Sequence, residues 1–365
     1  MSIVFITGCL EPGRDGVGDY TRRLAAECIR QGHASIILAL NDSHIVQEVL
    51  KTQTSEGVSI SVLRLPERMP WKDRVASARK WLDAFNPDWV SLQFVPFGFH
   101  PKGLPLGLAR NLKSIIGSRP LHWMFHELWV LWEFPLPLRK RLLGQVQKFS
   151  LRISLIQLKP KVVTTHLPVY KGELRKFGLA VELFPLHGNI PVRPPQDAYQ
   201  WLKVRYSLQQ TEKSLKAGFF GNILPTLDPH LVGDWISRVK APGQKVVILS
   251  AGKSGAESKN LWNSLANEFA NMATFLELGE LDERDSSFYF SALDYGLTAY
   301  PPELMGKSGS VAAMREHGLA VIPCGSMSND AGTRPRDASG IASVQPWSVK
   351  QSAHALLQQL QVDRF

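Results

Sequence analysis

Residues 2–40 read SIVFITGCLEPGRDGVGDYTRRLAAECIRQGHASIILAL, and this stretch decides the fold class. A short apolar run ends at a glycine, and a loop with Gly16 and Gly18 follows. From Asp19 onward apolar residues recur at helical spacing, and a second apolar run occupies 35–40. Strand, glycine loop, helix and strand in this order are typical of the start of a doubly wound α/β unit.

The same alternation continues along the chain, because apolar runs typical of buried parallel strands are separated by segments of helical periodicity. The predicted strands are 89–94, 121–125, 161–165, 181–186, 217–224, 245–252, 274–279, 295–300 and 320–325. The predicted helices include 169–177, 229–239, 286–293, 307–317 and 347–360. The sequence thus predicts an α/β protein with parallel sheets and helices on both faces.

A proline-rich segment at 190–200 loses this periodicity and predicts a linker between two domains. We expect an N-terminal Rossmann-like domain at 1–192 and a C-terminal one at 200–340. A final helix is expected within 345–365.

Composition excludes several classes of protein. The chain has 365 residues, of which 44% are hydrophobic and 20% charged, so disorder, collagen and coiled coil are excluded. The N-terminal apolar run has no basic leader, and no apolar run reaches the roughly 18 residues of a membrane span. Three widely spaced cysteines argue against a disulfide framework. We expect a cytoplasmic protein, peripheral on the inner face of a membrane.

The net charge of +10 suits nucleotides, phosphorylated lipids, membranes or nucleic acid. Seven cations and no acid lie in 138–161, interleaved with apolar side chains such as Leu142 and Phe149. This pattern is typical of a helix on an anionic membrane surface, and equally of a packed helix with a basic outer face. No nucleic-acid-binding motif accompanies the stretch, so we expect no nucleic-acid partner.

The glycine loop is the first candidate ligand site. Gly16 and Gly18 would let backbone amides approach a ligand, and the helix predicted to begin at Asp19 would direct its positive end toward an anion. The spacing is not that of a dinucleotide-binding loop, because no third glycine stands at the required step. The alternative is a turn that needs positive φ and binds nothing.

The second candidate lies in 301–325, where a carboxylate precedes glycines, serines and a lysine at a helix start. The residues are Glu303, Gly306, Lys307, Ser308, Gly309 and Ser310. Free amides, hydroxyls and a cation are the parts of a phosphate-binding nest. Neither GKS string, here or at Lys253, is a P-loop, because the preceding glycine is missing. The alternative for Lys307 is a solvated charge.

His126 follows the strand predicted at 121–125, where α/β folds bind ligands. Its alternative is a hydrogen-bonded core or cleft histidine. In a zinc-binding motif that began at His126, residue 130 would be the second histidine, but it is Val130, so we expect no metal site.

Two stretches together resemble a known family. GRDGVGDYTRRLAAECIRQGH at 13–33 resembles the amino-terminal signature of GT-B glycosyltransferases, especially the retaining family 4. The segment from Ala292 through Glu303 to HGLAVI at 317–322 resembles the carboxyl-terminal block of that family. FFGNILP, TFLELGEL and FHELW resemble further regions of the family in the same order.

The resemblance implies two Rossmann-like domains facing a central cleft. It also implies that the final helix, within 345–365, crosses back to the first domain. The nucleotide-diphosphate sugar would bind mainly to the second domain and the acceptor to the first. Glu303 matches a residue that contacts the donor sugar, His126 matches a histidine near that sugar, and Gly16 and Gly18 match glycines near the diphosphate.

This chain departs from the pattern at the diphosphate. The phosphate-binding Arg and Lys of the family fall on Asn222 and Leu227, and its second Glu falls on Val311 or Ala312. The physically sensible substitutes are the hydroxyls and cations nearby, because the charge of a departing phosphate must be neutralised. They are Lys253, Lys307, Ser308 and Ser310.

We therefore expect a glycosyltransferase of the hexosyltransferase class, with a nucleotide sugar as co-substrate and no obligatory cofactor. Retention is expected, and a lipid-linked or membrane-proximal acceptor would explain 138–161. The alternatives are another GT-B enzyme, such as a nucleotide-sugar epimerase, and a catalytically degenerate binding subunit.

Overall fold

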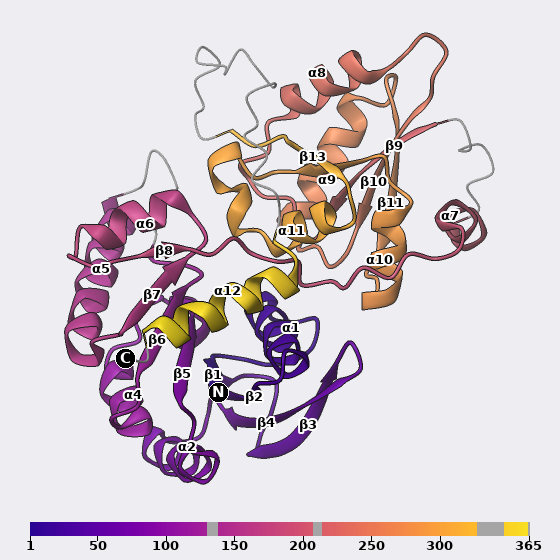
Figure 1. Ribbon diagram of the computed structural model, residues 1–365. Coiled ribbons are helices and arrows are strands. Elements are labelled where there is room, and N and C mark those ends of the chain that lie inside the picture. The colour runs from indigo at the N-terminus through magenta and orange to yellow at the C-terminus, as the bar shows by residue number, and fades with distance from the viewer. Residues whose placement is uncertain (130–137, 207–213, 327–346, 364–365) are drawn as a thin grey trace. The chain divides into compact units, whose positions relative to one another are not determined.

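The computed structural model describes residues 1–129, 138–206, 214–326 and 347–363 (Figure 1). The chain forms two compact units, Met1–Leu186 with Trp347–Phe365, and His187–Pro346. The segment predicted as a linker at 190–200 belongs to the second unit, where Ile190 is buried in the core. The predicted domain end at 340 lies outside the described residues.

The described part of the first unit contains an eight-stranded sheet in the order β3-β4-β2-β1-β5-β6-β7-β8. Its strands are β1 Ser2–Thr7, β2 Ala34–Asp42, β3 Val49–Ser55, β4 Val58–Pro66, β5 Trp89–Phe94, β6 Leu121–Phe125, β7 Val162–Thr165 and β8 Glu182–Leu183. All neighbours pair in parallel except β3 and β4. The strand predicted at 181–186 is observed as β8, which has only the residues Glu182–Leu183.

The antiparallel pair β3 and β4 was not predicted from the sequence. Glu56 and Gly57 join the strands with φ of 47° and 82°, the two left-handed positions of a tight hairpin turn. β3 contains KTQTS, mostly exposed at the sheet edge, so it has no apolar run to reveal it. Because β3 and β4 pair in antiparallel fashion, the sheet is mixed, whereas a parallel sheet was expected.

The helices of the first unit are α1 Gly16–Arg30, α2 Trp71–Phe85, α3 Pro96–Phe99, α4 Leu108–Ile116, α5 Leu138–Leu158, α6 Pro168–Arg175 and α12 Val349–Val362. Although they come from opposite ends of the chain, α12 and α1 pack side by side (Figure 1, yellow and indigo). Leu356 and Leu360 of α12 share a core with Leu24 of α1 and with β1 and β2.

The second unit has a parallel five-stranded sheet among its described residues, in the order β11-β10-β9-β12-β13. Its strands are β9 Leu215–Phe220, β10 Val246–Ala251, β11 Thr274–Gly279, β12 Tyr295–Thr298 and β13 Ala320–Pro323. Its helices are α7 Ala198–Tyr206, α8 Pro229–Val239, α9 Ala256–Glu268, α10 Glu283–Ser291, the 3₁₀ helix η1 Pro302–Lys307 and α11 Gly309–Glu316.

Apolar side chains cover both faces of this second sheet. Trp235 of α8 and Trp262 of α9 belong to one buried cluster, whereas Phe290 of α10 and Met314 of α11 belong to another. Helices on both faces of the sheet were predicted, and these two clusters confirm that prediction for this unit. Since all strands point the same way, the loops that follow them gather at one edge of the sheet.

Candidate functional site

The candidate residues at 303–310 lie on two consecutive turns after β12. Glu303 is exposed on η1, and Lys307 lies at its end with the ammonium 5.8 Å from the ring centre of Tyr300. The helix predicted at 307–317 is observed as α11, Gly309–Glu316. Lys307 belongs to η1 instead, because Ser308 ends η1 and caps α11.

Ser308 fixes the start of α11. Its hydroxyl accepts a hydrogen bond from the amide of Val311 at 3.3 Å and lies 3.0 Å from the hydroxyl of Ser310. The amides at the first positions of a helix have no acceptor within the helix, and the helix dipole makes them attractive to an anion. Gly309 and Ser310 hold those positions in α11.

A small hollow borders this turn. Asn222 and Thr298 line it from the ends of β9 and β12, and Tyr300, Ser310 and Met314 complete the wall near α11. The structure therefore brings together two of the predicted donor-binding residues, Asn222 and Ser310, at the carboxyl edge of the second sheet.

Asn222 also connects two loops. Its side-chain oxygen accepts a hydrogen bond of 3.0 Å from the amide of Gly255. This contact ties the loop after β9 to the loop after β10, which carries the exposed Lys253. Asn222 is thus a structural link between the two loops as well as a lining residue.

Asn189 is a candidate that sequence reasoning missed. A Cβ atom on Gly309 would lie 3.3 to 3.5 Å from the side-chain amide of Asn189, so the amide sits against the start of α11. Within the described residues its buried Oδ1 has no hydrogen-bond partner. No sequence signal could have found it, because Asn189 lies more than a hundred residues before the helix that it contacts.

His126 lies at the end of β6 in the first unit and is buried. Its Nε2 is 2.9 Å from Oε1 of Gln93, and its ring packs edge-on against Tyr20 with the centroids 4.9 Å apart. Burial, with a smaller contribution from nearby His122, lowers the pKa of His126 to about 3. The imidazole is therefore neutral near pH 7.

A chain of buried hydrogen bonds continues from His126 into the sheet. Gln93 Nε2 donates to Ser91 Oγ, which is 2.8 Å from His122 Nδ1. His122 Nε2 in turn lies 2.8 Å from Thr164 Oγ1, which donates to the sulfur of Met124.

The hydrogen bonds assign a donor and an acceptor to each contact from His126 to His122. Gln93 accepts with its oxygen, so His126 donates from Nε2, and Ser91, which receives the Gln93 amide, donates to His122 Nδ1. Both histidines then carry their proton on Nε2. Gln93 and Ser91 act as positioning residues that fix the orientation of the His126 ring.

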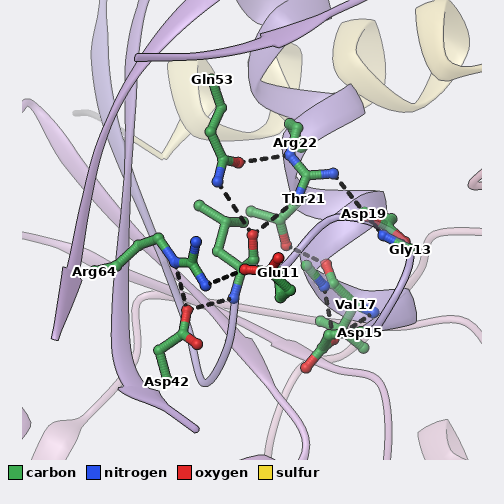
Figure 2. Close-up of polar contacts among 12 residues, drawn as sticks. Glu11, Gly13, Asp15, Val17, Asp19, Thr21, Arg22, Asp42, Gln53 and Arg64 are labelled. Atoms are coloured by element: carbon green, nitrogen blue, oxygen red, sulfur yellow. Dashed lines mark hydrogen bonds and ion pairs between the residues drawn. The ribbon is translucent and has the colours of Figure 1, made fainter. Parts of the chain in front are cut away.

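The glycine loop differs from the prediction. Helix α1 begins at Gly16, three residues before Asp19, because Asp15 caps it. The Asp15 carboxylate accepts hydrogen bonds from the amides of Val17 and Gly18 at 2.9 and 2.8 Å, and Asp19 accepts one from Gly13 at 3.1 Å (Figure 2). Burial is the main cause that raises the pKa of both aspartates.

Of the two glycines expected to face a phosphate, Gly18 donates its amide to the protein's own Asp15. Gly18 is required for another reason, since a Cβ there would lie 2.8 Å from the carbonyl oxygen of Cys9. Its lack of a side chain lets α1 pack closely against the loop that follows β1.

A network of buried charges holds the same loop from the other side (Figure 2). Arg64 forms ion pairs with Asp42 at 2.7 Å and with Glu11 at 2.6 Å. Arg22 donates to Gln53, to Asp19 and to the carbonyl of Leu10. Burial by itself would raise the pKa of Asp42, but hydrogen bonds from Arg64 and from two backbone amides outweigh it and lower the pKa.

Comparison with known proteins rests on structure alone. No protein-family model matches the chain, and no curated protein is similar in sequence. Sucrose-phosphate synthase from Thermosynechococcus elongatus is similar in structure, with a TM-score of 0.61, 14% identity, and coverage of 100% of this chain and 90% of that chain. Anabaena HepE in complex with UDP-glucose has a TM-score of 0.57, 14% identity, and coverage of 100% and 97%.

The chain has the fold of the GT-B glycosyltransferases. The UDP-GlcNAc 2-epimerase of Neisseria meningitidis, solved with UDP-GlcNAc, is also similar, with a TM-score of 0.52, 10% identity, and coverage of 99% of this chain and 100% of that chain. This likeness confirms the fold class predicted from the sequence.

The positions at which the sequence departs from the expected glycosyltransferase pattern include three buried residues. Leu227, at the position of the family lysine, is buried in the core, and its backbone bridges to Gly325. Val311 and Ala312, the two positions on one of which the second glutamate was expected, are buried residues of α11. These three positions serve packing and offer no charge to a ligand.

The candidate residues of this GT-B chain fall into two groups. His126, Gly16 and Gly18 belong to the first unit, whereas Asn222, Lys253, Glu303 and the turn at 306–310 belong to the second. Among the described residues, no cluster of acidic, histidine or cysteine side chains is arranged to hold a metal ion, and no helix has the length and apolarity to cross a bilayer.

Proposed function

We propose that this protein transfers a sugar from a nucleotide-diphosphate sugar to an acceptor hydroxyl, with retention at the anomeric carbon. The observation that carries the proposal is the turn of η1 and α11, where Ser308 caps a helix whose first amides border a hollow. Helix starts of this kind bind phosphate groups. The UDP-glucose and UDP-GlcNAc complexes of proteins with this fold support the choice of ligand.

In the proposed reaction, the bond from the anomeric carbon to the diphosphate breaks and a bond to the acceptor oxygen forms. The acceptor proton leaves with the nucleoside diphosphate. The amides at 306–309 other than that of Ser308, which donates to Met305, act together with Lys307 and Lys253. They neutralise the charge that develops on the leaving group, without a metal ion or other cofactor. Glu303 orients the sugar.

His126 lines the sugar site as a neutral hydrogen-bonding group in this proposal. Burial lowers its pKa to about 3, so near pH 7 it recognises hydroxyls and does not transfer a proton as an acid. We propose a lipid-linked or membrane-proximal hydroxyl as the acceptor and a cytoplasmic, peripheral location.

A thermal-shift screen of nucleotide sugars tests the donor. We expect one nucleotide sugar to raise the melting temperature, because a ligand that binds only the native state stabilises it. Lys307→Ala and Lys253→Ala should each weaken that shift, whereas Lys259→Ala, an exposed lysine of α9, should leave it unchanged. Glu303→Gln should retain the shift but slow release of nucleoside diphosphate by about 10²-fold.

The proposal fails if no nucleoside diphosphate binds the folded protein and Glu303→Gln turns over like the original chain. Glu257→Gln, another exposed acid of the second unit, is the matched control for loss of charge.

A catalytically degenerate binding subunit is the second candidate, favoured by the burial of Leu227 and by the contact that occupies the Asn222 oxygen. Such a subunit would bind a nucleotide sugar without turnover. An epimerase, favoured by the likeness to the UDP-GlcNAc 2-epimerase, would turn over its nucleotide sugar with no acceptor present. Product analysis with and without acceptor separates the three.

A further inference from the structure

Helix α5 carries a row of exposed, large apolar side chains. The exposed fractions are 72% for Leu138, 59% for Leu142, 49% for Val146, 65% for Phe149, 40% for Ile153 and 63% for Ile156. Successive members are three or four residues apart, so they form one stripe along the helix. We call these six residues the α5 stripe. At 1.5 Å per residue it is about 27 Å long.

The α5 stripe is not part of the core of the first unit. Its helix packs against the unit through Gly144, Gln147, Ser150, Leu151 and Leu155, which are buried. Figure 1 shows α5 beside α4, its packing partner. The buried face therefore contains a glycine, a glutamine and a serine beside two leucines, while the six large apolar residues of the stripe are exposed. Such an arrangement is the reverse of an ordinary surface helix, and it leaves a large apolar area in water.

Cations flank the α5 stripe. Arg139, Arg141 and Arg152 are exposed on the same helix, and the stretch 138–161 contains seven cations and no acid. Lys148 is the exception to the outward direction, since it pairs with Glu173 at 3.2 Å and lies over Trp129. By helical spacing, Arg139 lies along one side of the stripe, and Arg141 and Arg152 lie along the other.

We propose that α5 binds the surface of an anionic lipid bilayer, with its axis along the surface and the α5 stripe among the acyl chains. Leu, Ile and Phe on one side, flanked by arginines, form the side-chain pattern of helices that lie in the membrane interface. The flanking cations match the negative charge of acidic headgroups. This inference rests on the proposed function only for the location of the acceptor, because the binding itself needs no catalysis.

A second copy of this chain is the less suitable occupant. If two copies paired through the α5 stripe, they would bring the same arginines together with no acid in 138–161 to offset them. An anionic surface removes that repulsion.

The test is flotation of the full chain with vesicles of phosphatidylcholine, with or without phosphatidylglycerol. We expect binding to the anionic vesicles and at least about tenfold weaker partitioning to the neutral ones. Phe149→Ser with Ile153→Ser should lower partitioning to anionic vesicles by about tenfold or more. The control is Val204→Ser, a still more exposed apolar residue of α7 in the second unit, which should not change it.

A charge pair tests the cations separately. Arg141→Gln with Arg152→Gln should weaken binding to anionic vesicles, and raised salt should weaken the original chain in the same way. Lys72→Gln with Lys80→Gln, two exposed lysines of α2, should have little effect. An unchanged melting temperature shows that the variants are folded.

Equal flotation of the original chain and the Phe149→Ser, Ile153→Ser variant overturns the proposal, as does an absence of binding to any vesicle. A dimer in sedimentation without lipid that dissociates in the same variant would overturn it in favour of a second copy. Nucleotide-sugar binding is measured on the same variants. Its absence alongside intact flotation would reject the proposed function and leave this inference standing.

Discussion

At the residue scale, two neutral histidines are the most unusual groups of the first unit. Burial lowers the pKa of His122 to about 3, and burial together with His122 does the same for His126. Both rings are enclosed by the strands at the middle of the sheet and held by Gln93, Ser91 and Thr164. The sequence could place His126 at a strand end, but the hydrogen-bond chain joins residues from three strands and has no sequence pattern.

The histidines predict an acid sensitivity. The unfolded chain takes up a proton on each histidine below about pH 6.5, whereas the folded chain does not until about pH 3. Stability is therefore lost as the pH falls through this window, and we expect the free energy of unfolding to drop by about 2 kcal/mol per histidine between pH 7 and 5. Urea unfolding at the two pH values measures the drop.

Substitution of His122 by Asn should flatten that pH dependence even if it lowers stability at pH 7. His354→Gln, an exposed histidine of α12, should keep the original dependence. If the free energy of unfolding changed with pH to the same extent in both variants, the low pKa assigned to His122 would be contradicted.

At the element scale, the start of α1 shows how a helix can satisfy its own anion site. Asp15 and Asp19 bind three amides of this region, and Gly18 brings the helix within contact of the loop after β1. The glycines suggested a loop open to phosphate, because their spacing carries no information on which carboxylate reaches which amide.

Gly18→Ala should destabilise the first unit by about 1–3 kcal/mol, because its Cβ would lie 2.8 Å from a backbone oxygen that cannot move alone. Gly16→Ala is the matched control on the same turn, since nothing lies within 4 Å of its added Cβ. Urea midpoints of the two variants give the comparison. Equal stability would show that the close approach at Gly18 is not rigid.

At the scale of the whole molecule, the last helix belongs to the unit that begins the chain. Leu356 and Leu360 of α12 are almost fully buried against α1 and the first strands. The N-terminal unit therefore has a complete core only after the final residues of the chain are present.

Leu360→Ala should lower the free energy of unfolding of the first unit by about 2–5 kcal/mol, the usual cost of a cavity left by a buried leucine. Val362→Ala removes an apolar side chain that is 76% exposed on the same helix and should change stability little. The rate at which a protease cleaves each unit can be measured in both variants. Cleavage within the first unit should become faster in Leu360→Ala only.

The sequence by itself determined the α/β class, most strands and the candidate turn at 303–310, because buried parallel strands are continuous apolar runs that end at glycine or at a loop. It did not reveal the hairpin of β3 and β4, whose edge strand is polar. The tertiary structure alone decided that Leu227 is a core residue, which side chains of α12 enter the first core, and that the apolar stripe of α5 points outward. Each of these features depends on which face of an element contacts residues that are distant in the sequence. When a helix has apolar residues on two sides, its sequence does not indicate which side is buried.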